Sequence, residues 1–381
     1  MSYRYKLPIL LLIALAAFWT VSVSTPGLTL ISGIFIAGAA ILAYFLFPWN
    51  VPAKNTLHQK LKIQVPPHSI EEAHKRFEQL TNDQCQPQLG ALNFDVTGDV
   101  RALDHYFPIT KMLSDTEIES FYQLVTHIAE HPNFDIQLIG SDTKNLTDQL
   151  PNSARHLVAG HLAEVFFFRQ DILKRFLHTP RHFQLYTTFE AFHQDGGVKG
   201  GCYNPNRECI QLVLSRLFEG FNGATPGVCP FLHELGHMLD HFDAGIGSMK
   251  RAEGFYPGLR ASDGDVFTPS ARDAFIKGKR LELDRYLARQ TGDLSQPMPI
   301  GHPYVFQNNG EFAAGYLEAF FRNPNYFASQ NPDLFAAYQE LFDYDPRKAW
   351  KVDFPNYVKK NRDFYTSGEK PPKAGLTIPE E

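Results

Sequence analysis

The chain has 381 residues, of which 44% are hydrophobic and 20% are charged, and its formal net charge is −5. This composition is typical of a globular protein with one or two domains, and it excludes a disordered or fibrous chain. The weakly acidic balance provides no overall basic field, so we expect no nucleic-acid partner. The four cysteines include no C-x-x-C pair and are too few for a disulfide framework, which favours a reducing compartment.

Two apolar runs, residues 7–23 and 28–49, precede the first acidic residue, Glu71. At about 1.5 Å per residue the second run can span a hydrocarbon core of about 30 Å, whereas the first is borderline short. The pattern predicts a transmembrane helical hairpin over residues 1–49, with the lipid bilayer as a partner through residues 7–49.

Basic residues flank both ends of this predicted hairpin on the same side, which by the positive-inside rule places both ends in the cytoplasm. We therefore expect a multi-pass protein of the bacterial inner membrane whose remaining chain is cytoplasmic. The alternative is that the first apolar run is cleaved as a signal peptide and the second remains as a single anchor.

After the hairpin the sequence suggests a juxtamembrane linker (50–68), one folded domain (69–365) and a disordered tail (366–381). Ser114 and Glu117 form a capping box at the start of one amphipathic helix. A second helix is expected over 153–177, a third over 270–291 and a helical block over 310–343.

Between these helices the hydrophobic period changes to two in residues 182–192 and 208–217, which predicts two strands. The Gly-rich segment between them is interpreted as a long hairpin connection, because it lacks the strand–turn–helix spacing of a phosphate-binding loop. The strand over 208–217 is a plausible sheet edge on which an extended peptide could add. Together these elements predict an α+β fold with a small mixed sheet.

The stretch HELGH, residues 233–237, places two histidines four residues apart with a glutamate after the first. On an α-helix His233 and His237 then lie on one face and can bind one metal ion. Glu234, offset by about 100°, can reach a metal-bound water. In this H-E-x-x-H arrangement two imidazoles hold Zn²⁺ and the glutamate is the general base. A satisfied pair of core histidines is the alternative, but the helix is otherwise apolar and burial of unpaired polar groups is costly.

The third ligand is left open by this motif. His241 lies about 12 Å along the helix from the first histidine, which is too far. Asp243 would need a metzincin-like turn with a glycine where Asp240 stands, and Asp240 is better interpreted as an acceptor that orients an imidazole. Glu311 and Glu318 lie seven apart on one face of an apolar helix, and Glu311, at its N-terminal end, is the better candidate. Glu318 is expected to bond a backbone group or a side chain deeper in the core.

The segment HELGHMLDHF, followed by Y-x6-E-F-A-A-x3-E-A-F, resembles the zinc peptidase family of Mlc titration factor A and the catalytic domain of anthrax lethal factor. The resemblance covers about residues 150–347 and implies a zincin-like catalytic domain of the gluzincin type. It implies three zinc ligands: His233, His237 and Glu311. It also implies that Glu234 is the general base and that Tyr304 stabilises the oxyanion or protonates the leaving amine. The N-terminal hairpin departs from the soluble titration factor, so the natural substrate does not carry over.

The sequence thus predicts a membrane-anchored, zinc-dependent peptidase that cleaves a peptide or protein substrate with a zinc-activated water and Glu234 as general base. Endo- and aminopeptidase activity both remain open. The alternative is a membrane-anchored regulatory binding protein with a structural or latent zinc site. A structural site has no need of a general base and usually closes its fourth position, which favours the peptidase.

Overall fold

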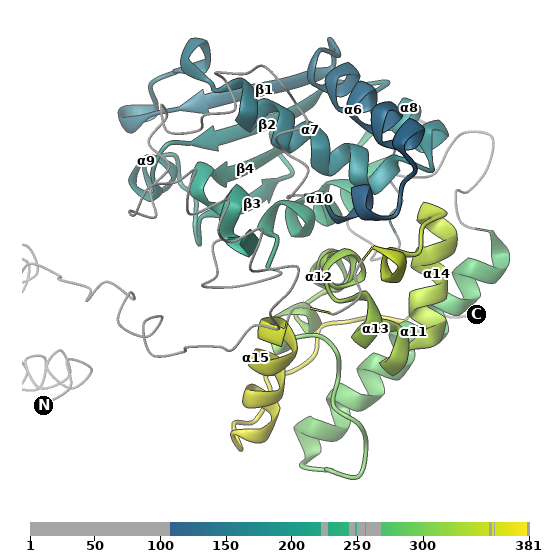
Figure 1. Ribbon diagram of the computed structural model, residues 1–381. Coiled ribbons are helices and arrows are strands. Elements are labelled where there is room, and N and C mark those ends of the chain that lie inside the picture. Colours follow the sequence, from purple (N-terminus) through teal and green to yellow (C-terminus); the bar gives the residue numbers. More distant parts are fainter. Residues whose placement is uncertain are drawn as a thin grey trace, which may run out of the picture. The chain divides into compact units, whose positions relative to one another are not determined.

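The computed structural model describes residues 107–221, 228–243, 248–249, 256, 268–349, 353 and 355–378 (Figure 1). The predicted hairpin and the juxtamembrane linker lie outside the described residues. In the part of the chain that the structure describes, no helix is both long enough and apolar enough to cross a bilayer. The membrane anchor therefore remains a prediction.

A small four-stranded mixed sheet forms the β part of an α+β fold, as expected. Its strands are β1 (Phe134–Ile139), β2 (Arg181–Tyr186), β3 (Gly201–Asn204) and β4 (Cys209–Val213). The strand order is β1-β2-β4-β3, in which β1, β2 and β4 run parallel and β3 is antiparallel to β4. β3 is therefore an edge strand. The two-residue strands β5 (Phe242–Asp243) and β6 (Ser248–Met249) form a separate pair.

The expected strand over 182–192 is too long. β2 ends at Tyr186, and helix α9 (Phe189–Gln194) follows. Thr188 caps this helix, because its side chain accepts a hydrogen bond from the backbone N–H of Ala191. A helix start signal therefore overrides the alternating pattern.

The expected strand over 208–217 is also too long, and its proposed position in the sheet is wrong. β4 ends at Val213, where the 3₁₀ helix η6 (Leu214–Phe221) begins. β4 lies between β2 and β3 and is not an edge. The Gly-rich segment is not a hairpin connection between β2 and β4, since these strands are parallel; it contains β3, which turns back to pair with β4.

The remaining described α-helices are α6 (Asp115–Ala129), α7 (Asn152–Phe166), α8 (Gln170–Phe176), α10 (Pro230–His241), α11 (Pro269–Thr291), α12 (Asn309–Arg322), α13 (Pro324–Gln330), α14 (Pro332–Phe342) and α15 (Pro355–Thr366). The predicted capping box is confirmed: the Glu117 carboxylate accepts from the Ser114 N–H at 2.8 Å, and the Ser114 hydroxyl accepts from the Glu117 N–H.

The single helix expected over 153–177 is wrong, because the chain breaks between α7 and α8. Arg169 occupies the break, where its Nη1 donates to the Leu341 carbonyl at 2.7 Å. The helical block expected over 310–343 is likewise three helices, and prolines begin the second and third of them.

Helix α10 lies between the sheet and the C-terminal helices (Figure 1). It contacts β3 and β4 on one side and α12 on the other. Gly236 of α10 permits a close crossing, since a Cβ atom there would lie 2.5 Å from the Cα atom of Ala314 on α12. The two helices are therefore in backbone contact at the middle of α10.

The C-terminal segment that we expected to be disordered, residues 366–381, makes ordered contacts in its described part. The Gly375 N–H donates to the Phe306 carbonyl at 2.9 Å, and the Tyr286 hydroxyl donates to the Pro372 carbonyl at 2.8 Å. Asn309, at the start of α12, binds both the backbone N–H and the hydroxyl of Thr377. The polar composition of this segment hid the fact that its backbone finds specific partners.

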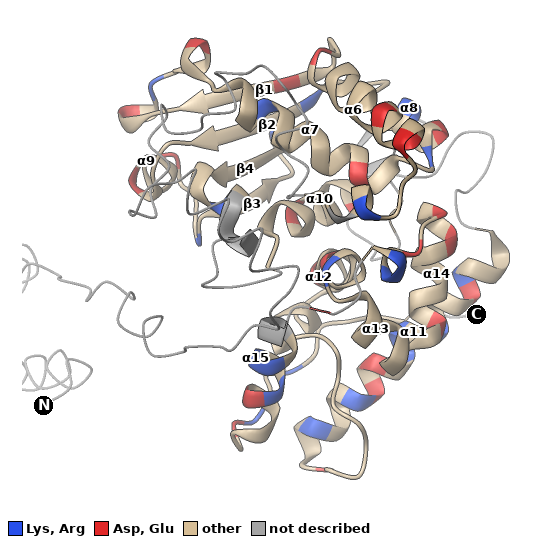
Figure 2. Cartoon of the chain, viewed as in Figure 1, with Lys and Arg blue, Asp and Glu red and all other residues tan. Residues whose placement is uncertain are grey.

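Acidic and basic residues are interspersed on the outer helices, for example along α11 (Figure 2). This distribution gives these helices no surface of a single sign.

Candidate metal centre

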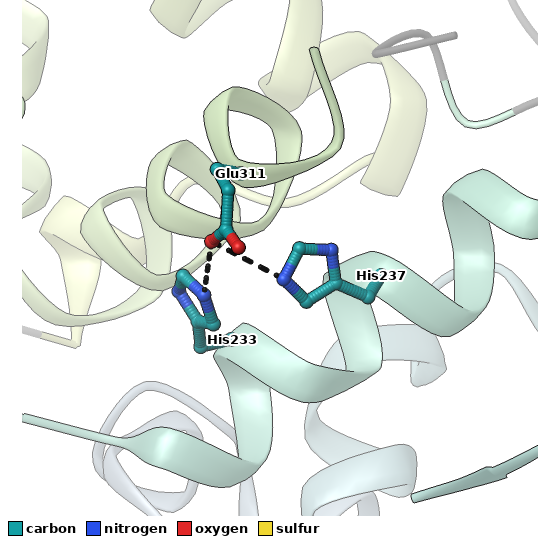
Figure 3. Close-up of side chains that lie close together, drawn as sticks. All are labelled: His233, His237 and Glu311. Carbon is teal, nitrogen blue, oxygen red and sulfur yellow. Dashed lines mark hydrogen bonds and ion pairs between the residues drawn. The ribbon is translucent and has the colours of Figure 1, made fainter. Parts of the chain in front are cut away.

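Two helices bring together three side chains that could hold a metal ion (Figure 3). His233 and His237 extend from α10, and Glu311 extends from the first turn of α12. The Nε2 atoms of His233 and His237 lie 3.1 Å and 3.3 Å from Glu311 Oε2. One possible ligand atom from each of the three residues lies within 4.8 Å of the others. In the described part of the chain, this is the group of histidine, cysteine and acidic side chains that could hold a metal ion.

Local sequence explains the placement of each ligand. In α10 the side chains of Leu232, Leu235 and Leu239 are buried in the core, which leaves the half-buried face of the helix to His233 and His237. In α12 the side chain of Asn308 caps the helix by accepting from the Glu311 N–H at 2.9 Å. This cap fixes where α12 begins, and Glu311 therefore lies in its first turn.

The residues present fit a tetrahedral metal ion. With metal–ligand bonds of about 2.0–2.2 Å, tetrahedral ligand atoms are roughly 3.3–3.6 Å apart. The observed separations of 3.1 Å and 3.3 Å from Glu311 to the two histidines are close to this value. Two imidazoles and one carboxylate leave a fourth position for another ligand, which is the pattern of catalytic rather than structural sites.

In the metal-free chain the three ligands are coupled by charge. Burial alone would lower the pKa of His233, but the hydrogen bond to Glu311 and the nearby carboxylates outweigh it and raise the pKa to about 9. Burial would raise the pKa of Glu311, but the hydrogen bonds from both histidines outweigh it and hold that pKa well below its usual range. The site is therefore an imidazolium–carboxylate pair at neutral pH, and a metal ion must displace a proton to bind.

Glu234 and Tyr304 lie beside the three ligands. Glu234 is buried, and its Oε1 atom lies 3.6 Å from the position that a Cβ atom on Gly201 of β3 would occupy. Tyr304 belongs to the 3₁₀ helix η8 (Pro303–Phe306), and its hydroxyl donates to Glu311 Oε1 at 2.8 Å. Burial, followed by the charge of Glu311, raises the pKa of Tyr304 above its usual value and keeps the phenol protonated.

A further layer of polar groups supports the site. The Glu318 carboxylate accepts from the Cys229 N–H at 2.7 Å at the start of α10, and its other oxygen lies 3.8 Å from His233 Nδ1. The prediction that Glu318 bonds a backbone group is confirmed. Asp240 accepts from the Tyr256 N–H at 2.9 Å, while its predicted role toward an imidazole stays a prediction.

His241, another candidate for the third ligand, does not belong to the group. His241 donates through Nδ1 to the His237 carbonyl at 3.0 Å and makes a tilted ring contact with Tyr203, with ring centroids 5.3 Å apart. The side chain of Asp243 lies outside the described residues.

Sequence reasoning missed two features near the site. The edge strand is β3 rather than β4, and only the pairing pattern reveals this. Lys199, just before β3, places its ammonium 4.4 Å from the centroid of the Tyr304 ring. Its sequence context, V-K-G-G-C, carries a signal for a turn but none for a site.

Comparison with known proteins adds no relative: no protein-family model matches the chain, and neither does any curated protein.

Proposed function

We propose that the chain is a membrane-anchored, zinc-dependent peptidase with a zincin-like catalytic domain, similar to the zinc peptidase family of Mlc titration factor A. The observation that carries the proposal is the grouping of His233, His237 and Glu311 at ligand distance, with Glu234 buried beside it. Two nitrogen ligands and one oxygen ligand are typical of catalytic zinc in peptidases. The proposed hairpin at residues 7–49 would hold this domain at the cytoplasmic face of the bacterial inner membrane.

The chemistry follows from the residues of the chain. When bound, zinc supplies Lewis-acid polarisation of water and of the scissile carbonyl. Glu234 takes the proton of the attacking water as general base and returns it to the leaving amine. The Tyr304 hydroxyl, which remains protonated, exchanges Glu311 for the developing oxyanion and donates a hydrogen bond to it. His233 binds as a neutral imidazole once it has lost its proton, and His237 provides the second nitrogen ligand.

The neighbouring sheet edge favours a peptide as substrate. Among the described strands β3 pairs with β4 alone and so forms one edge of the sheet, the place where a further strand can add. β3 also contacts α10, and Gly201 places no side chain between the strand and Glu234. An extended peptide that adds to β3 would cross the site in front of the general base.

The test compares the native full-length chain with Glu234→Gln, both purified in detergent. Zinc content is measured by atomic emission and peptide hydrolysis with a quenched-fluorescence library. Both proteins should bind one zinc, and only the native chain should cleave. Glu119→Gln, the same change at an exposed position of α6, is the matched control and should retain native activity.

Two results would contradict the proposal in different ways. If both proteins bind zinc and neither cleaves, the site is structural or latent and a regulatory binding function takes precedence. If the native chain binds no zinc at low micromolar concentration, the grouping of ligands serves the fold rather than a metal.

A further inference from the structure

A six-residue loop, 195–200, connects α9 to β3 and leads to the candidate site. Its backbone adopts positive φ at Gly196 (84°), Lys199 (69°) and Gly200 (83°). The left-handed conformation is easy for glycine but unfavourable for lysine. The conformation at Lys199 must therefore be imposed by what holds the loop.

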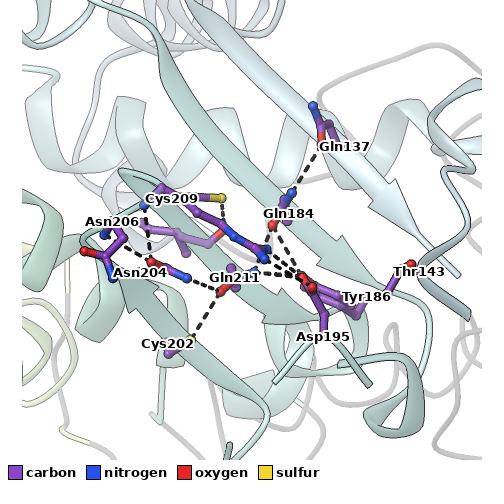
Figure 4. A network of polar contacts seen from close by, with 12 residues as sticks. Gln137, Thr143, Gln184, Tyr186, Asp195, Cys202, Asn204, Asn206, Cys209 and Gln211 are labelled. Atoms are coloured by element: carbon purple, nitrogen blue, oxygen red, sulfur yellow. Dashed lines mark hydrogen bonds and ion pairs between the residues drawn. The ribbon is translucent and has the colours of Figure 1, made fainter. Parts of the chain in front are cut away.

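The start of the loop is held by a polar network on the sheet (Figure 4). Asp195 accepts hydrogen bonds from the Tyr186 hydroxyl at 2.5 Å and from Arg207 Nη1 at 2.7 Å. Gln211 of β4 donates to the same carboxylate at 3.3 Å and to the Tyr186 oxygen at 2.7 Å. The hydrogen bonds from Arg207 and from the Tyr186 hydroxyl hold the pKa of Asp195 below its usual value, so the Asp195 carboxylate remains charged.

The end of the loop is held by the sheet itself. The Val213 N–H donates to the Gly200 carbonyl at 2.9 Å, and Gly201 then begins β3. The ring of Phe189, on α9, covers Gly200 so closely that a Cβ atom there would lie 2.5 Å from it. Both ends of a short loop are thus held, and the backbone position of Lys199 between them is held with them.

Lys199 is directed at the catalytic side of the site rather than at a structural partner. Its ammonium lies over the Tyr304 ring, 4.4 Å from the centroid, and the side chain is exposed. It forms no ion pair or hydrogen bond with any residue in the described ranges. The Tyr304 ring is partly buried but the ammonium is exposed, so the cation–π contact is weak and the ammonium can exchange it for a carboxylate.

We infer that Lys199 is a specificity-determining residue that binds a carboxylate of the peptide substrate close to the scissile bond. The inference rests on the proposed peptidase function. The carboxylate can belong to an aspartate or glutamate side chain or to the free C-terminus of the peptide, since both present the same chemistry to an ammonium. Glu234 and Glu311 would repel such a group in the metal-free chain, and a bound divalent ion offsets their charge.

The experiment uses the zinc-loaded full-length chain and matched peptides built on one cleaved sequence. One arm compares Asp or Glu with Asn or Gln at each position flanking the cleaved bond; the other compares a free C-terminus with an amide. The native chain should favour one carboxylate position by about fivefold in kcat/KM, the size expected for a single exposed ion pair. The arm that shows the preference identifies the source of the carboxylate.

Two variants show whether Lys199 causes the preference. Lys199→Met keeps the length of the side chain and should abolish the preference, so that the kcat/KM ratio of the charged peptide to its neutral counterpart falls from about 5 to about 1. Lys199→Glu should reverse it and favour a lysine at the same position, which a purely structural role of the loop would not produce. Lys277→Met, at an exposed lysine on α11, is the control and should leave the preference intact.

The outcomes separate this inference from the proposed function. If the native chain cleaves but shows no carboxylate preference, or if Lys199→Met retains it, the inference is wrong and the peptidase function stands. If the native zinc-loaded chain cleaves no peptide, both are wrong.

Discussion

Replacing Gly236 by alanine should weaken metal binding without touching a ligand. A Cβ atom at this position would lie 2.5 Å from the Ala314 Cα atom and 3.1 Å from its Cβ atom. Ordinary contact begins at 3.4 Å, so α10 and α12 must separate by roughly 1 Å. The same movement carries His233 and His237 away from Glu311, because the first two extend from one helix and the third from the other.

The expected magnitude follows from two opposing effects. Overpacking of a tight contact costs about 1–3 kcal/mol, whereas alanine is favoured over glycine in a helix by about 0.5–1 kcal/mol. We therefore expect a net loss of about 1–2 kcal/mol, which lowers Tm by about 2–4 °C per kcal/mol. Displacing a ligand pair by roughly 1 Å should reduce zinc affinity about 10- to 100-fold, in the range seen when groups that orient ligands are lost.

The assay is calorimetric titration of the chelated protein with zinc, together with thermal unfolding. Gly278→Ala is the matched control, since a Cβ atom there would lie 2.7 Å from the Leu334 backbone nitrogen where α11 crosses α14. Both variants should lose stability, but only Gly236→Ala should lose zinc affinity. A Gly236→Ala protein that is more stable than native and binds zinc equally well would refute the reasoning.

Three further predictions concern groups outside the ligand shell or the metal-free state. Glu164→Gln removes the buried carboxylate that accepts from Arg322 at 2.7 Å and 3.0 Å, and it should cost about 3–5 kcal/mol in urea unfolding because a buried guanidinium loses its counter-charge. Deletion of 371–381 should lower Tm, because the free energy of unfolding falls by about 1 kcal/mol for each hydrogen bond lost. It should also weaken zinc binding, because the bonds from Gly375 and Thr377 hold the segment in which α12 begins. The pKa of His233 is raised to about 9 and that of Glu311 is lowered, so their interaction should stabilise the chelated protein most between about pH 4.5 and 6.5. Urea titrations should show that this stabilisation is lost as the pH rises through 9 or falls into the acid range. The Glu311→Gln variant should show no such pH dependence.

Elements whose signals are local could be predicted from the sequence. The capping box of Ser114 and Glu117 acts within four residues, and the structure has α6 beginning directly after it. The helix expected over 270–291 is α11, which begins after the Thr268 cap and ends at Thr291. The H-E-x-x-H spacing likewise fixes its own geometry, because a single turn of helix places both histidines on one face.

Features that depend on distant partners could not be predicted in this way. The break between α7 and α8 is stabilised by a bond from Arg169 to Leu341, 172 positions later. The strand order of the sheet depends on parallel pairing of β1, β2 and β4. The sequences that connect these strands do not indicate which strand lies in the middle. β3 has only four residues inside a Gly-rich segment, so its edge position was invisible although it borders the candidate site.

The site depends chiefly on one helix crossing. His233, Glu234 and His237 have fixed relative positions within α10, and Tyr304 and Glu311 are joined within the segment that leads into α12. Helical geometry sets each half, so assembling the site reduces to how α10 and α12 meet.

Two buried polar contacts hold α12 in place near this crossing. Glu318 of α12 caps the start of α10 through the Cys229 N–H, and Arg322 at the end of α12 binds Glu164 of α7. These groups touch no reacting atom, yet each fixes α12 relative to the layer that carries α10. Substitutions of these groups should therefore change metal affinity in proportion to how far they move α12 relative to α10. A substitution that destabilises the fold elsewhere should leave metal affinity unchanged.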